Sequence, residues 1–63
     1  MSRHDEVEIA CELVHETDRA LLINDGRQEV WVPRSQILDQ KEKNGVLESI
    51  TIPEWLAEEK DLV

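Results

Sequence analysis

Residues 20–33 read Ala-Leu-Leu-Ile-Asn-Asp-Gly-Arg-Gln-Glu-Val-Trp-Val-Pro, two apolar runs separated by a turn sequence. Asp-Gly between two apolar runs is typical of a β-hairpin, because both central residues of a type I′ turn need a positive φ. We therefore expect residues 21–23 to pair antiparallel with residues 29–32. The loop would contain either Asp25-Gly26 alone or Asn24 as a third residue.

Trp31 lies in the middle of the second strand of this hairpin, on the opposite face from the two valines that flank it. Two interpretations of this residue stay open. In the first, the valines point into the core and a C-terminal helix covers Trp31, bringing Trp55 close to it. In the second, Trp31 is exposed and anchors a binding partner. Its polar neighbours in that second case would be Arg34 and Gln36.

The segment before the hairpin predicts a strand over residues 7–13, because apolar and polar residues alternate there with a period of two. Cys11 falls on the apolar side and is expected to be a small buried hydrophobe rather than a reactive thiol. Two adjacent apolar residues, Leu13 and Val14, break the alternation and predict a β-bulge. Residues 15–18 would then form a polar turn.

The segment after the hairpin begins with Pro33, which has no N–H to donate and should end the strand. Residues 34–38 are expected to form a tight turn that places Ile37 or Leu38 in the core. The polar run 39–45 predicts a mobile loop. A fourth strand should contain Val46, Ile50 and Ile52.

A short helix is predicted over about residues 53–60, with Thr51 and Glu54 as a capping box at its start. Proline is tolerated in the first turn of a helix, so Pro53 is compatible with this start. So short a helix is unstable alone in water and must dock. The side chains available for docking are Trp55, Leu56 and Leu62.

With 63 residues, the chain is one small domain near the lower limit for folding without disulfides or metals. We expect residues 1–6 to be a mobile leader and residues 7–63 to form the domain. The fold class is mainly β with one short C-terminal helix, an antiparallel SH3-like or OB-like partly open barrel of four or five short strands. The alternative is a three- or four-stranded sheet with the helix packed on one face.

Charge decides the class of partner. Seven Lys and Arg against fifteen Asp and Glu give a net charge of −8, which repels nucleic-acid phosphates and anionic lipids and favours a protein partner with a basic surface. No apolar segment is long enough for a membrane span or the apolar core of a signal peptide, so we expect a cytoplasmic protein. Homodimerisation stays open.

Catalytic and metal-binding patterns are weak. Two histidines and one cysteine do not make a structural zinc site, and no nucleophile elbow or glycine-rich oxyanion turn is present. We therefore expect no enzyme, no cofactor and no metal. The acidic residues are either a solubilising surface or a binding row in which Glu8, Glu12 and Glu16 share one strand face, about 13 Å apart.

Two segments carry a resemblance that spans Leu13 to Leu62. Val-Trp-Val-Pro-Arg-Ser-Gln-Ile, followed by Ile-Thr-Ile-Pro-Glu-Trp-Leu-Ala-Glu-Glu-Lys, resembles a group of short uncharacterised phage, prophage and bacterial proteins. The resemblance implies a mobile-element context and no particular activity. The expected function is a non-enzymatic interaction protein, for example an anti-CRISPR-like inhibitor that mimics nucleic acid and blocks a host or defence nucleic-acid-handling protein. The alternative is an assembly module that acts through homo-oligomerisation or an open sheet edge.

Overall fold

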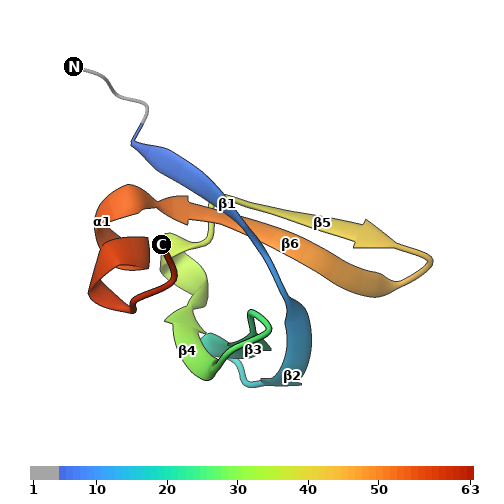
Figure 1. Ribbon diagram of the computed structural model, residues 1–63. Coiled ribbons are helices and arrows are strands. Elements are labelled where there is room, and N and C mark those ends of the chain that lie inside the picture. The colour runs from blue at the N-terminus through green and yellow to red at the C-terminus, as the bar shows by residue number, and fades with distance from the viewer. Residues whose placement is uncertain (1–4) are drawn as a thin grey trace.

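The computed structural model describes residues 5–63 and contains two three-stranded antiparallel sheets and one short α-helix (Figure 1). The mainly β fold with a C-terminal helix is thereby confirmed. Six strands replace the expected four or five, and the two sheets do not close into a barrel. The first sheet has the order β1-β6-β5 and the second β2-β3-β4. The elements are β1 (Glu6–Ala10), β2 (Glu12–Glu16), β3 (Ala20–Asn24), β4 (Glu29–Pro33), the 3₁₀ turn η1 (Arg34–Gln36), β5 (Asp39–Lys43), β6 (Val46–Pro53) and α1 (Glu54–Glu59).

The two sheets share one bent length of chain, because only Cys11 separates β1 from β2. The Cys11 N–H donates to the carbonyl of Glu48 at 3.0 Å, so this residue still bonds to β6 before the chain turns into the second sheet. Four residues of the leader, 1–4, lie outside the described residues. The other two contact the domain: Glu6 pairs with Pro53, and the carbonyl of Asp5 accepts the N–H at the start of α1.

A β-bulge interrupts β2 at the expected place. Leu13 pairs with Ile23 and His15 pairs with Leu22, so Val14 has no partner on β3. The polar turn predicted over residues 15–18 is wrong in its first half, since β2 continues to Glu16. One extra residue in β2 shifts every later side chain to the other face of the sheet.

The hairpin of β3 and β4 is confirmed, but its loop is longer than predicted. The last pair is Asn24 with Glu29, which leaves residues 25–28 as a four-residue loop. Asp25 has no positive φ, so the type I′ turn is wrong. The side chains explain the wider loop: Asn24 Oδ1 accepts the Gly26 N–H at 2.7 Å, and Asp25 Oδ1 accepts N–H groups from the two residues after Gly26, at 2.9 and 3.0 Å.

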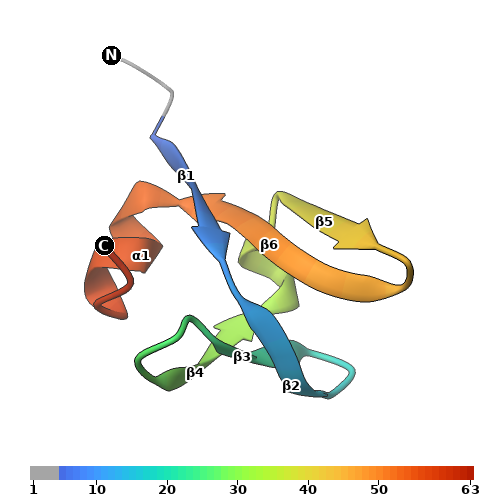
Figure 2. The ribbon, with the colours of Figure 1, turned by 45° about the vertical axis from the view of Figure 1, so that its right-hand side comes forward.

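A second hairpin, β5 and β6, replaces the mobile loop predicted over residues 39–45. Lys43 pairs with Val46 across a two-residue turn in which Asn44 has φ 55° and Gly45 has φ 79°. Positive φ at both positions is what a type I′ turn requires, so Asn-Gly forms here the turn that was expected of Asp-Gly. All of β5 is exposed, and the hairpin projects from the rest of the molecule (Figures 1 and 2).

This second hairpin turn yields a stability prediction. A Gly45→Ala variant should lose about 1–2 kcal/mol, because an L residue is strained at a φ of 79° even where its Cβ meets nothing. For a domain of this size that loss lowers the melting temperature by several degrees. Thermal denaturation followed by circular dichroism checks it, with Lys43→Ala as a control at an exposed neighbour. A melting temperature equal to that of the wild type would contradict the turn assignment.

The core lies between the two sheets and under α1. Its largest fully buried side chains come from β3, β4 and β6, and Val30 packs against them from β4, so the two valines that flank Trp31 do point inward as predicted. Ile37 also reaches the core, whereas Leu38 is 52% exposed. The buried residues are Ile9, Cys11, Leu21, Ile23, Val32, Leu47, Ser49, Ile50, Ile52, Leu56, Ala57 and Leu62.

Helix α1 docks through Leu56 and Leu62, as expected, but not through Trp55, which is 55% exposed. The predicted capping box is wrong because β6 continues through Pro53, which occupies the N-cap position without a side-chain hydrogen bond. Thr51 is instead a strand residue that pairs with β1 and β5. Strand pairing therefore overrides the local capping signal.

Candidate functional site

Trp31 stands on the solvent face of the sheet β2-β3-β4, opposite the buried side chains of Leu21 and Ile23. It is 44% exposed. Helix α1 packs on β6 and β1 of the other sheet, so the interpretation in which the helix covers Trp31 is wrong. Figures 1 and 2 both show α1 near the start of β1.

A row of three side chains crosses this face. Leu22 pairs with His15 on one side and with Trp31 on the other, and directly opposite residues of an antiparallel sheet share a face. The His15 and Trp31 rings meet edge to face above the row, with centroids 6.2 Å apart and planes at 90°. Such T-shaped pairs contribute about 0.5–1.5 kcal/mol beyond the area that they bury. The Trp31 ring is thus held in place although it is half exposed.

The bulge at Val14 determines which side chain stands beside Trp31. Without it, the residue after Leu13 would lie opposite Leu22, and that residue is Val14. With it, His15 takes this position. An imidazole ring therefore replaces a valine in the aromatic row.

A second row, on the side nearer to the β3–β4 loop, is acidic. Asn24 pairs with Glu12 on β2 and with Glu29 on β4, and both glutamates are exposed. Diagonal neighbours on adjacent strands lie about 7–8 Å apart. Asn24 of the acidic row and Trp31 of the first row are such a pair, so one partner side chain can contact both rows. We call the two rows together the Trp31 face. It consists of Glu12, His15, Leu22, Asn24, Glu29 and Trp31.

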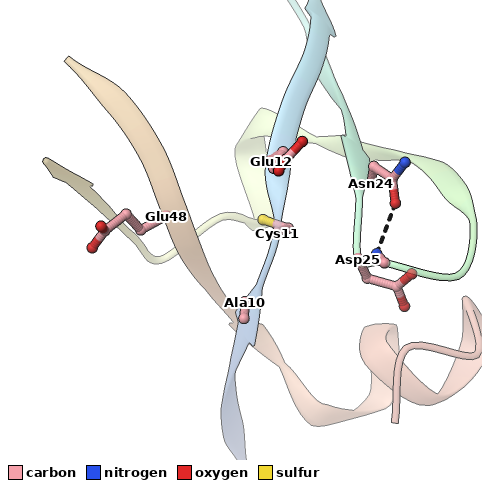
Figure 3. Close-up of a pocket in the computed structure, with 7 residues that line it drawn as sticks. Ala10, Cys11, Glu12, Asn24, Asp25 and Glu48 are labelled. Carbon is pink, nitrogen blue, oxygen red and sulfur yellow. Dashed lines mark hydrogen bonds between the residues drawn. The ribbon is translucent and has the colours of Figure 1, made fainter. Parts of the chain in front are cut away.

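A shallow pocket of about 480 Å³ adjoins the acidic row (Figure 3). It extends from Glu12 past Cys11 to Glu48, and Asn24 and Asp25 line its other side. The carboxylate of Asp25 is turned onto its own loop, where it accepts the two backbone hydrogen bonds described above. The charges that this pocket offers to solvent are consequently those of the two glutamates.

Two groups beside this pocket have shifted pKa values. Burial raises the pKa of the Cys11 thiol, and the nearby Asp25 charge adds to the rise. The thiol is therefore kept protonated, which disfavours a nucleophile. The pKa of Asp25 is lowered, chiefly by the hydrogen bond from the Arg27 N–H. The pocket thus combines fixed negative charge with an unreactive thiol, a setting for contact with a cationic side chain.

The predicted acidic row does not exist as one surface. Glu12 pairs with Asn24 on the solvent face, whereas Glu16, beyond the bulge, pairs with Leu21 and lies on the opposite face. Glu8 belongs to the other sheet, where it pairs with Thr51. The bulge that the sequence predicted is itself the reason that a single row of glutamates is wrong.

Arg34 and Gln36 do not surround Trp31 as predicted polar neighbours. Arg34 Nε donates to the carbonyl of Thr17 at 2.9 Å, and a guanidinium nitrogen lies 3.5 Å from Glu16. These contacts tie the end of β4 to the β2–β3 turn. Gln36 is half-buried at the end of η1. Of the six predicted binding candidates, the structure brings together Trp31 and Glu12.

Glu8 is engaged within its own sheet. Its carboxylate accepts a 2.6 Å hydrogen bond from the buried Ser49 hydroxyl, and Lys41 Nζ lies 3.3 Å from the same oxygen. The Ser49 bond and then Lys41 lower the pKa of Glu8. This arrangement favours a structural role for Glu8, in joining β1 to β6 and β5.

Acid should destabilise the protein through Glu8 and Asp25. Both have folded-state pKa values below their ordinary values of 4.5 and 3.8. Their contribution to stability is fully present above those ordinary values and is lost as the pH falls through the depressed ones. Glu8→Gln should flatten the fall in melting temperature below about pH 5, whereas the exposed Glu58→Gln, with the same change of charge, should not. Parallel pH profiles for the wild type and Glu8→Gln would count against this linkage.

Four members of the Trp31 face were not among the predicted binding residues: His15, Leu22, Asn24 and Glu29. His15 was assigned to a turn, yet the bulge signal at Leu13-Val14 would have placed it opposite Leu22 if β2 had been extended. Leu22 and Glu29 belong to the predicted hairpin, but its four-residue loop gives a register in which Leu22 lies opposite Trp31 and Glu29 opposite Asn24.

Comparison of the chain with protein-family models, with curated proteins and with solved structures found no match. Within residues 5–63, no helix is long and apolar enough to cross a membrane. In the same stretch, no group of three or more His, Cys, Asp or Glu is placed to hold a metal ion.

Proposed function

We propose that this chain is a non-enzymatic interaction protein that binds a basic protein surface through the Trp31 face. The observation that carries the proposal is a half-exposed tryptophan braced by His15 and flanked by an acidic row. Tryptophan dominates the energetics of many protein interfaces, because a large ring buries much area at little conformational cost. Glu12 and Glu29 add charge complementarity beside it.

Net charge supports a basic partner over a nucleic acid. At −8, the chain would attract a cationic surface from a distance and orient the encounter. A basic groove of a nucleic-acid-handling protein is a partner of this kind. With the resemblance to phage and prophage proteins, this favours an inhibitor that acts in the cytoplasm of a bacterial host. The second candidate remains an assembly module, favoured by the exposed edges of both sheets.

The finer fold assignment is also a proposal. A strongly bent strand shared by two small sheets, with a 3₁₀ turn between β4 and β5, fits an SH3-like or OB-like partly open barrel. In such a barrel the solvent face of one sheet is available for ligands. The Trp31 face would be that surface.

The decisive comparison is Trp31→Ala against Trp55→Ala. Both remove an exposed tryptophan, at 44% and 55% exposure, but Trp55 stands on α1, which packs on the other sheet. In pull-downs from a bacterial host lysate, the wild type and Trp55→Ala should retain a common partner that Trp31→Ala loses. A loss of about 2 kcal/mol or more, roughly thirtyfold in affinity, is expected for an anchor of this type. Circular dichroism must show that both variants fold, and equal retention by both would reject the Trp31 face.

A further inference from the structure

Strand β4 is an edge strand, and the hydrogen bonds at its two ends determine which backbone groups face outward. The Asp25 N–H donates to the Gln28 carbonyl, and the Arg34 N–H donates to the Arg19 carbonyl. Hydrogen-bonded and non-hydrogen-bonded pairs alternate in an antiparallel ladder. Between those ends, Val30 and Val32 bond to β3, whereas Glu29, Trp31 and Pro33 direct their backbone groups to the free edge. Because the backbone of residue 33 faces away from β3 in this alternation, a proline at this position removes no hydrogen bond between β3 and β4.

The free edge of β4 therefore offers the N–H and C=O of two consecutive outward residues, Glu29 and Trp31. Within residues 5–63, no strand pairs with that edge, and no turn or loop backbone bond reaches either residue. An exposed row of unpaired N–H and C=O groups is a template for another strand. The edge is short because the chain turns away at Pro33.

Each sheet has two edge strands, β2 and β4 in one and β1 and β5 in the other, and the edges of β4 and β5 differ in how they are protected. Strand β5 carries charge at four of its five positions, including Lys41 and Lys43, which is a common protection against strand pairing. Strand β4 has no lysine or arginine and places Trp31 at its centre. Within residues 5–63, β4 is the edge strand that carries a tryptophan at its centre beside its open backbone groups.

We propose that the β4 edge takes up an extended segment of the basic partner as an added antiparallel or parallel strand. This inference rests on the proposed function and specifies its binding mode. Residues of the added strand that share the Trp31 face would lie near Glu29 and should be Lys or Arg. The alternate residues would face the side of Val30 and Val32 and should be small and apolar. A second copy of this chain is disfavoured because each copy carries a charge of −8.

Two backbone substitutions test the edge without removing the tryptophan ring. Glu29→Pro removes an outward N–H and leaves the hydrogen bonds between β4 and β3 in place. Glu29→Ala is the control, because it removes the same charge and keeps the N–H. A chain of 63 residues is also short enough for chemical synthesis with an N-methyl group on the Trp31 amide. The probe is an end-capped hexapeptide of alternating Lys and Val, compared with its Glu-for-Lys counterpart by fluorescence anisotropy.

We expect Glu29→Pro and N-methyl-Trp31 to weaken binding of the Lys-Val peptide at least tenfold, and Glu29→Ala less than fivefold. In the free protein, hydrogen exchange should be fast at the Trp31 amide and slow at Val30 and Val32. The peptide should slow exchange at Trp31. If both variants fold and bind like the wild type, or if the peptide does not bind or leaves exchange at Trp31 unchanged, strand addition is overturned.

The outcome for strand addition is separable from that for the proposed function. A partner that is lost with Trp31→Ala but kept with N-methyl-Trp31 would leave the Trp31 face as the site and overturn only the edge. Sedimentation of the protein alone completes the test. A mass that rises with concentration, and does not rise in Glu29→Pro, would assign the edge to a second copy and overturn the basic partner strand.

Discussion

Ile50→Ala is expected to remove a large part of the free energy of unfolding. Ile50 is fully buried in β6, where it pairs with Ile9 on one side and Gln40 on the other. Truncation of a buried isoleucine costs about 2–5 kcal/mol, from lost transfer free energy and the cavity that remains. A 63-residue domain has roughly 3–9 kcal/mol in total, at 0.05–0.15 kcal/mol per residue. The loss is therefore a large part of the whole.

Urea denaturation followed by circular dichroism measures this effect, and Leu38→Ala is the matched control. Leu38 is 52% exposed and contributes a backbone N–H to Thr51, which alanine keeps. Its truncation should change stability by no more than about 0.5 kcal/mol. A midpoint for Ile50→Ala close to that of the wild type would show that the two sheets do not depend on this residue for their contact.

Reversing both charges of the acidic row is expected to abolish most of the electrostatic attraction to the partner. The double variant Glu12→Lys/Glu29→Lys has a net charge of −4, four units less negative than the −8 of the wild type. Glu58→Lys/Glu59→Lys has the same net charge, and its lysines lie at the end of α1, where the helix dipole tolerates them. A difference between these two variants therefore reports the position of the charge and not its sum.

We expect the first variant to lose at least tenfold in affinity at low salt and the helix variant less than threefold. The Debye length falls from about 10 Å at 0.1 M salt to about 3 Å at 1 M, so the difference should shrink as salt rises. Surface plasmon resonance with the captured partner would separate association from dissociation, and most of the change should be in association. Equal losses in the two double variants would indicate steering by net charge alone and remove the acidic row from the site.

The hairpin of β3 and β4 and the bulge in β2 could be predicted because each has a local cause. Asn-Asp-Gly interrupts two apolar runs, and the pair Leu13-Val14 breaks a strict alternation. Strand β5 has no such local signal, since Asp-Gln-Lys-Glu-Lys contains no apolar residue. It is a strand because the Asn44-Gly45 turn folds it back along β6. The turn and the neighbouring strand β6, rather than the residues of β5 itself, determine this structure.

The candidate site was only partly predictable for a related reason. The prediction that Glu8, Glu12 and Glu16 share a face assumed one uninterrupted strand, whereas the chain bends at Cys11 and bulges at Val14. Trp31 is exposed because helix α1 covers the other sheet, and that choice depends on where Leu56 and Leu62 find space. The bulge could be predicted, but the bend at Cys11 and the position of α1 cannot be read from the spacing of residues along the sequence.

The bulge at Val14 also has a consequence for how such a protein can evolve. Deletion of Val14 would leave Leu13 opposite Ile23 and His15 opposite Leu22, so both rows of pairs would keep their partners. A substitution at position 15 would change the ring that supports Trp31 while the inward-facing side chains of β3 stay the same. Replacement of the codon for residue 15 could therefore alter partner preference between lineages without a compensating change in the core, whereas loss of the codon for Val14 would leave the face as it is.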